Sequence, residues 1–277
     1  MSRTTESRAD YRGLYYEWEH QQWSAGEIDL VEDHRQWHDT LSPELRRTFR
    51  WVLAPLHIAR HQATETLVPF VDAAPTEEQQ VILTTQLVDV ARHLVFLDRF
   101  CSEVIGSDEP DMRAGVDAQI TELNHASRTL LVDVLPDVSR RIRNDRDNLE
   151  SLVEGIVTHH IVIEATLVST GQRVLLDLLR DLGLLPGLRE GLIAVARDGT
   201  RHVSFGVHFL QETVTSDERF AHVITKTIDD LTPVALAAIE PGEDTPYWDP
   251  LPYRAEDLTT LAREALAEHR RAIGVSA

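Results

Sequence analysis

The chain repeats apolar residues with the period of an α-helix along most of its length. Apolar positions recur three and four residues apart, which places them on one face of a helix. Seven segments show this spacing: 43–70, 76–106, 110–134, 145–181, 186–215, 217–239 and 255–272. No segment alternates β-branched and polar residues as a half-buried strand does. The pattern therefore predicts an all-α protein.

Local signals mark where several of these helices begin and end. Ser42 followed by Pro43 is typical of a helix start, and residues 76–79 (TEEQ) have the form of a capping box. Gly106 and Gly183 are expected helix ends, and Pro136 is expected to follow one. Asn144 or Asp145 is the expected cap of the longest helix. We expect Pro55 to kink or break the first helix.

The helices are expected to form a single domain over residues 1–277. No low-complexity linker interrupts residues 42–240. We expect a core bundle over about 43–215, with further helices over 217–272. Between them, segment 241–253 holds four prolines and is expected to be an extended surface connection.

Composition and charge exclude some classes of function. The formal net charge is −19, which argues against binding nucleic acid through a basic face. The single cysteine, Cys101, rules out an internal disulfide and fits a reducing compartment. The first residues are polar, whereas a signal peptide contains an apolar stretch. No run of apolar residues approaches the ~20 that a membrane span requires. We expect a cytoplasmic protein that binds neither nucleic acid nor membrane.

Two segments repeat an acid–histidine pair. Residues 89–96 read DVARHLVF and residues 198–205 read DGTRHVSF. Each places an Asp and a His four residues apart, so both polar groups emerge on one helix face. Helical bundles that hold metal ions at their centre repeat an acid–histidine motif in this way, but with Glu three residues before each His. Here those positions are Val90 and Gly199.

Glu164 lies in an otherwise apolar stretch of the longest predicted helix, on the same stripe as His160. A carboxylate on a core face must be protonated, paired or bound to metal. The first helix offers His57, Arg60 and His61 as partners. We expect Glu164, His93, His202 and one of these groups to meet inside the bundle.

At this point the sequence resembles a known family. The phrases that carry the resemblance occur in that family's order and spacing, over about residues 14–212. They are 23–29, 33–37 followed by 41–44, 86–100, 163–171 and 197–210. The chain is similar to the ribonucleotide reductase small subunits and the related ligand-binding oxidases of the ferritin-like superfamily. The resemblance implies a ferritin-like helical bundle, and a homodimer.

The family binds two metal ions with four carboxylates and two histidines, and this chain departs from that set. By position, His93, Glu164 and His202 match retained ligands. Arg60, Val90 and Gly199 stand where the other three carboxylates belong. One carboxylate cannot neutralise two dications in a low-dielectric core, so an ordinary two-metal site is not expected. Ribonucleotide reduction is not expected either. Leu97 takes the place of the radical tyrosine, and the last residues lack the tyrosine-bearing tail.

Other parts of the family's site are retained. Trp23, Asp198 and His93 match a relay in which the Asp binds the ligand His and the Trp passes an electron. Asp89 is expected to orient His202 in the corresponding way. A carboxylate behind an imidazole fixes its tautomer and raises its basicity.

Three functions remain open. The first is an O₂-dependent oxidase or oxygenase of a small organic substrate, with Fe, Mn or Cu at His93, Glu164 and His202, and with His57, His61 or His160 as additional ligands. The second is a metal-independent enzyme in which Arg60 pairs with Glu164 or binds a substrate anion and the imidazoles move protons. The third is a non-catalytic ligand-binding protein.

Overall fold

The computed structural model describes residues 10–240 and 254–275, and these contain helices and no strand. The N-terminal half comprises α1 (Tyr11–His20), α2 (Val31–Asp39), α3 (Pro43–Thr66), α4 (Val68–Ala73), α5 (Glu77–Phe100), η1 (Cys101–Ile105), α6 (Met112–Gln119) and η2 (Ile120–Glu122). The rest comprises α7 (His125–Arg128), η3 (Thr129–Val134), α8 (Leu135–Asn144), α9 (Leu149–Ile156), η4 (Val157–Val168), α10 (Ser169–Leu182), α11 (Pro186–Ser216), α12 (Arg219–Ile239) and α13 (Ala255–Ile273).

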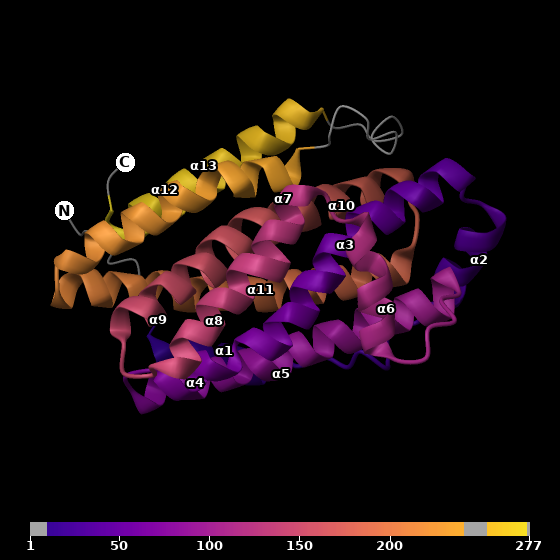
Figure 1. The fold of residues 1–277 in the computed structure, drawn as a ribbon. Helices are drawn as coiled ribbons and strands as arrows, with labels where there is room; N and C mark the ends of the chain where they lie inside the picture. Colours follow the sequence, from indigo (N-terminus) through magenta and orange to yellow (C-terminus); the bar gives the residue numbers. More distant parts are fainter. Residues whose placement is uncertain (1–9, 241–253, 276–277) are drawn as a thin grey trace, which may run out of the picture.

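The helices form an elongated bundle, in which α12 and α13 lie side by side along one flank and α4 and α5 lie along the other (Figure 1). The central helix is the continuous run of α9, η4 and α10, which packs against α11, α12 and α13. The prediction of an all-α bundle is confirmed. The assignment of residues 1–277 to one domain stays a prediction.

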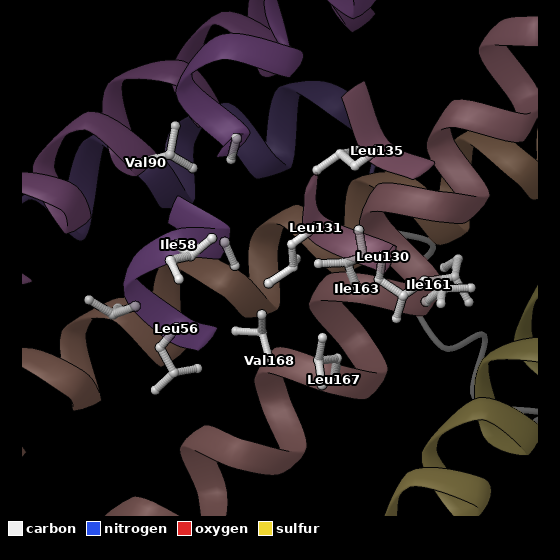
Figure 2. Packing of buried hydrophobic residues seen from close by; sticks show 14 of the residues in the cluster. Leu56, Ile58, Val90, Leu130, Leu131, Leu135, Ile161, Ile163, Leu167 and Val168 are labelled. Atoms are coloured by element: carbon white, nitrogen blue, oxygen red, sulfur yellow. The ribbon is translucent and has the colours of Figure 1, made fainter. Parts of the chain in front are cut away.

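One cluster of buried apolar side chains extends from Leu14 near the start of the bundle to Val275 near its end. Figure 2 shows part of it, including Leu56 on α3, Leu130 on η3 and Ile163 on η4. The central helix is apolar and long enough over Leu149–Leu182 to cross a membrane by composition alone, but 94% of its apolar window is buried inside the protein. Its composition is therefore that of a core helix. The cytoplasmic location stays a prediction.

Most of the expected helix starts and ends are confirmed. The Ser42 hydroxyl accepts a hydrogen bond from the backbone N–H of Leu45, and Thr76 and Gln79 form the capping box. Gly106 and Gly183 end their helices with φ of 78° and 64°, a conformation that glycine adopts without steric cost.

Three expectations about helix boundaries are wrong. Helix α3 is not broken at Pro55, because the residues around it are buried in the core and hold the helix together. The alternative expectation, a kink at Pro55, stays a prediction. The helix likewise does not end before Pro136, because η3 runs directly into α8 and Val134 between them keeps helical backbone angles. The cap of the central helix is Asn148, whose side chain accepts from Ser151 N, rather than Asn144 or Asp145. Segment 241–253 lies outside the described residues.

A side chain from α2 fixes the start of α11, the helix that carries the second acid–histidine pair. The two carboxylate oxygens of Asp33 accept hydrogen bonds from the backbone N–H groups of Gly187 (2.8 Å) and Leu188 (2.7 Å). A carboxylate at a helix N-terminus satisfies free N–H groups and complements the helix dipole. A Cβ at Gly187 would lie 2.2 Å from the carbonyl oxygen of Asp29, so only glycine fits there.

Candidate functional site

A buried cluster of charged side chains lies where α3, α5, η4 and α11 meet. Arg60 comes from α3, Asp89 and His93 from α5, Glu164 from η4, and Asp198 and His202 from α11. None of them is more than 4% exposed. The sequence therefore predicts correctly which helices bring their polar groups together.

Each histidine of the repeat contacts the aspartate of the other segment. His93 Nε2 lies 3.0 Å from Asp198 Oδ2, and His202 Nε2 lies 3.1 Å from Asp89 Oδ2. The Trp23 indole N–H donates to Asp198 Oδ2 at 2.8 Å. These contacts are the ones that the acid–histidine repeat and the family relay predict. Their catalytic role stays a prediction.

Arg60 forms a buried ion pair with Glu164. Arg60 Nη1 lies 2.7 Å from Glu164 Oε1, and the two side chains are 4% and 2% exposed. The second carboxylate oxygen, Oε2, has no hydrogen-bond partner in the described structure, and His159 Nε2 lies 3.5 Å from it. The fixed positive charge of Arg60 thus neutralises Glu164. The correspondence of Arg60 to a carboxylate ligand of the family stays a prediction.

The two central imidazoles have different surroundings. His202 lies against a carboxylate on both sides, since its Nδ1 is 3.2 Å from Glu164 Oε1 and its Nε2 faces Asp89. Carboxylates only accept hydrogen bonds, so the doubly protonated imidazolium satisfies both contacts. His93 uses Nε2 toward Asp198, and its Nδ1 has no partner in the described structure. A neutral imidazole fits that environment.

The pKa shifts agree with this assignment. Burial opposes the charged form of His202, but the carboxylates of Glu164 and Asp89 outweigh it and raise the pKa to about 9. Burial, with a smaller contribution from the charge of Arg60, lowers the pKa of His93 to about 4 despite the opposing hydrogen bond to Asp198. Burial alone would raise the pKa of Asp198, yet its contacts with His93, Trp23 and Arg201 lower it. At neutral pH the His93–Asp198 contact is therefore a hydrogen bond to an ionised carboxylate.

Two arginines that the sequence analysis does not single out complete the charge balance. Arg201 Nη2 lies 2.8 Å from both Asp89 Oδ2 and Asp198 Oδ1. Arg92 contacts the same two aspartates and lies over the Trp23 ring at 5.1 Å. The signal for both was present, because each repeated segment places an Arg three residues after its Asp.

The relay around Trp23 has a counterpart that sequence reasoning also missed. The Trp18 indole N–H donates to Asp89 Oδ1 at 3.0 Å, so Trp18–Asp89–His202 repeats the order of Trp23–Asp198–His93. Trp18 lies on α1 and Trp23 between α1 and α2, far in sequence from the acid–histidine segments. Their spacing along the chain therefore does not predict these contacts. The cluster therefore has two similar halves, each made of a Trp, an Asp and a His.

A π-helix decides which histidine of the central helix faces Glu164. The sequence analysis favours His160, four residues before Glu164, which would share its face in an α-helix. Segment η4 is instead a π-helix, whose wider turn brings residues five apart together. Glu164 consequently faces His159, and His160 Nε2 lies 2.9 Å from Gln86 Oε1. The prediction that His160 accompanies Glu164 is wrong for this reason.

The other two additional ligands predicted from sequence lie apart from this cluster in the described structure. His57 Nδ1 is 3.2 Å from Gln119 Oε1 and 3.9 Å from Cys101 Sγ, on the side of α3 that faces α6 and η1. His61 is on the same side, near the charges of Glu65 and Arg113. Burial lowers the pKa of His57 to about 4 and raises that of Cys101 to about 11, so both are neutral at pH 7.

The arrangement does not fit a two-metal cofactor. Glu164 is the one carboxylate at the ligand positions, and it is paired with Arg60. Both nitrogens of His202 face carboxylates, so neither is free to bind a metal. In the described ranges, no group of three or more His, Cys, Asp or Glu is placed to hold a metal ion. A guanidinium in the former ligand position also repels an incoming dication.

A pocket of about 270 Å³ leads from the surface to the Arg60–Glu164 pair. Its walls come from α10 and α11, and Gly199 lies beside its buried end. Within the polar cluster, Arg60 and Glu164 line this pocket, whereas His93 and His202 do not.

Comparison with known proteins identifies the architecture. A family model described as ribonucleotide reductase, small chain, matches residues 8–239. Among solved structures, the chain is similar to variants of an R2-like ligand-binding oxidase. One has an anaerobically reconstituted Mn/Fe cofactor, with a TM-score of 0.84 at 20% identity over 99% of this chain and 96% of that one. A second has a non-activated Mn/Mn cofactor and the same values. A third, with an aerobically reconstituted Mn/Fe cofactor, has a TM-score of 0.85. At this identity the likeness shows the fold.

Proposed function

The chain belongs to the ribonucleotide reductase small chain family, and within it we propose that this protein is an enzyme that carries out metal-independent acid–base chemistry on a small organic molecule. The observation that carries the proposal is the Arg60–Glu164 ion pair at the buried end of an open pocket. It places a permanent cation and a hydrogen-bonding carboxylate where the family's pattern expects metal ligands.

The side chains around the pair suggest separate roles. His93 has an unpartnered Nδ1 and a carboxylate behind Nε2, which is the arrangement of a general base. His202 faces two carboxylates, so it is held as an imidazolium whose charge compensates those of Glu164 and Asp89. Arg60 would bind and orient the substrate.

A second candidate function is an O₂-dependent oxidase or oxygenase that holds one metal ion, or an atypical set, at His93, Glu164 and His202. The observation that favours it is the intact Trp23–Asp198–His93 chain, since a relay to an electron acceptor has no use in acid–base chemistry. The similar solved structures hold Mn/Fe or Mn/Mn cofactors, which makes Fe and Mn the metals to test, with Cu as a third. We place this candidate second because Glu164 is already paired with Arg60.

One experiment separates the two. Chelator-treated protein and protein loaded anaerobically with Fe(II) or Mn(II) are incubated in D₂O with a panel of small hydroxy, amino and keto acids. Proton NMR then follows isotope exchange and conversion. The proposal predicts equal conversion by the metal-stripped protein, and its loss in His93→Gln. Conversion that requires added metal and consumes O₂ would favour the oxidase. Binding without any conversion would favour a non-catalytic ligand-binding protein.

We also propose a homodimer, as the family resemblance implies. Exposed valines on α5 recur every seven residues, at Val81, Val88 and Val95, with 47%, 48% and 38% of each exposed. This spacing puts them on one helix face, where a second copy of the chain would cover them. Light scattering of the wild type and of Val88→Asp tests the dimer, with Val31→Asp, also exposed but on α2, as the matched control.

A further inference from the structure

Gly199 leaves an open space directly over the ion pair. A Cβ built at this position would lie 3.3 Å from Glu164 Oε1 and 4.0 Å from Arg60 Nη2. Because glycine has no side chain, both polar atoms border the pocket between α10 and α11. Nη1 of Arg60 is engaged by Glu164, whereas Nη2 faces this space. Arg60 Nη2 is therefore available to donate a hydrogen bond to a ligand at the buried end of the pocket.

The charges along the pocket also favour an anion. Arg173 lines it and is exposed, and no ion pair of Arg173 is found among the described residues. Asp177, the acid at the same rim, is engaged by Arg180 at 2.7 Å. At the buried end, Glu164 is neutralised by Arg60. The positive charge left without a partner is that of Arg173, so the pocket attracts negative rather than positive ligands.

We propose that this pocket binds a small organic carboxylate, whose carboxylate group lies over Gly199 and accepts a hydrogen bond from Arg60 Nη2. Arg173 at the mouth supplies a second positive charge. The inference rests on the proposed function, for which it names the substrate class. The pocket volume of about 270 Å³ lies below the usual range for ligand pockets, which limits the ligand to a small molecule.

The direct test measures the binding of small ligands to the wild-type protein by NMR titration at low salt. The probes are propionate, its uncharged isostere propionamide, and inorganic phosphate. The charge-assisted contact predicts that propionate binds about tenfold more tightly than propionamide. Equal affinity for the two, or tighter binding of phosphate than of propionate, would overturn the proposal.

Variants of an exposed arginine locate the site without threatening the fold. Arg173→Gln should weaken propionate binding about threefold to fivefold, as expected for an exposed charge at low salt. Arg189→Gln is the matched control, because Arg189 is equally exposed on α11 but lies outside the pocket. An equal effect of the two substitutions, or none from either, would contradict binding at this pocket.

Substitution of Gly199 tests the position of the ligand's carboxylate. Gly199→Glu and Gly199→Gln should both abolish propionate binding, since either side chain fills the space. The Glu variant carries its own carboxylate next to Arg60 Nη2, so its Tm should exceed that of the Gln variant. The proposal would be wrong if Gly199→Gln kept its affinity for propionate, or if the Gly199→Gln protein had a higher Tm than the Gly199→Glu protein. These measurements need no turnover. Conversion of acids without propionate binding would therefore remove this inference alone, and binding without conversion would remove only the proposed chemistry.

Discussion

Arg60 and Glu164 form an ion pair with a 2.7 Å contact, and both side chains are almost completely excluded from solvent. Burying a charge costs desolvation free energy, and the attraction between two buried opposite charges offsets that cost. Either charge buried without the other would be strongly destabilising. Glu164 also contacts His202 through the same oxygen. Arg60 and His202 therefore both stabilise the ionised form of Glu164.

Removal of the cation alone should be costly. Arg60→Met leaves the Glu164 carboxylate buried without its arginine partner, and we expect a loss of about 3 kcal/mol in the free energy of unfolding. Arg60→Met combined with Glu164→Leu removes both charges and should recover part of that loss. Urea denaturation of the two proteins measures the difference. A double variant less stable than the single one would show that the pair is not the stabilising unit.

The pH dependence of stability should report the charge of His202. Its pKa in the folded protein is about 9, above the ordinary value of 6.5. A raised pKa contributes stability that is fully present below pH 6.5 and is lost as the pH rises through 9. Unfolding free energies between pH 6.5 and 9.5 should therefore fall for the wild type, and fall less for His202→Gln. Identical slopes in the two proteins would show that the imidazolium does not form.

His93 should act in the opposite direction. Its folded-state pKa is about 4, below the ordinary 6.5, so the unfolded chain binds its proton more tightly. Its contribution is present above pH 6.5 and is lost as the pH falls through 4. His57, with the same lowered pKa, contributes to the same acid limb. NMR titration of the His93 imidazole checks the assignment directly, and a midpoint above 6.5 would contradict it.

Trp18 should act as a positioning residue for His202. Trp18→Phe removes the indole N–H that donates to Asp89 while keeping an aromatic ring, and we expect a loss of about 1 kcal/mol. The freed Asp89 should also shift the His202 imidazole resonances, which a purely structural role would leave unchanged. Trp23→Phe is the matched control, since it acts on Asp198 and should shift His93 instead. The same shifts in both variants would argue against two separate halves.

Close packing between α11 and α5 should make one glycine irreplaceable. A Cβ at Gly191 would lie 2.0 Å from the Phe96 ring, so Gly191→Ala must displace a buried aromatic side chain. We expect a destabilisation of about 1–3 kcal/mol. Gly115→Ala in α6, where no atom lies within 4 Å, should instead stabilise by about 0.5–1 kcal/mol. Thermal unfolding of the two variants measures the contrast, and a neutral Gly191→Ala would contradict the packing.

The helical periodicity of apolar residues predicts much of the fold, and the acid–histidine repeat with Glu164 predicts part of the site. The D-x-x-x-H repeat and the lone Glu164 identify the helices that meet, because in an α-helix the spacing along the chain determines the face. Arg92 and Arg201 belong to the same repeat, but arginine is not a metal ligand, so the repeat alone predicts no role for them in a metal site. The prolines at 55 and 136 mislead, since tertiary packing overrides helix-breaking at Pro55 and the helix runs without interruption from η3 into α8 through Pro136.

The rest of the site depends on features that spacing does not encode. The π-helix over η4 rotates His159 toward Glu164 and His160 toward Gln86, and the sequence there reads as an ordinary apolar helix. Trp18 reaches Asp89 across the bundle from a separate helix, 71 residues away. Such contacts become visible only when the helices are packed together.

The central claim, that Arg60 occupies the place of a metal ligand, is tested most directly by measuring metal content. The wild-type protein is dialysed anaerobically against Fe(II), Mn(II) or both, and the bound metal is determined by elemental analysis. We predict substoichiometric metal under each condition, because one paired carboxylate cannot neutralise the charge of the ions. One or two tightly bound ions per chain, held at His93, Glu164 and His202, would contradict the account.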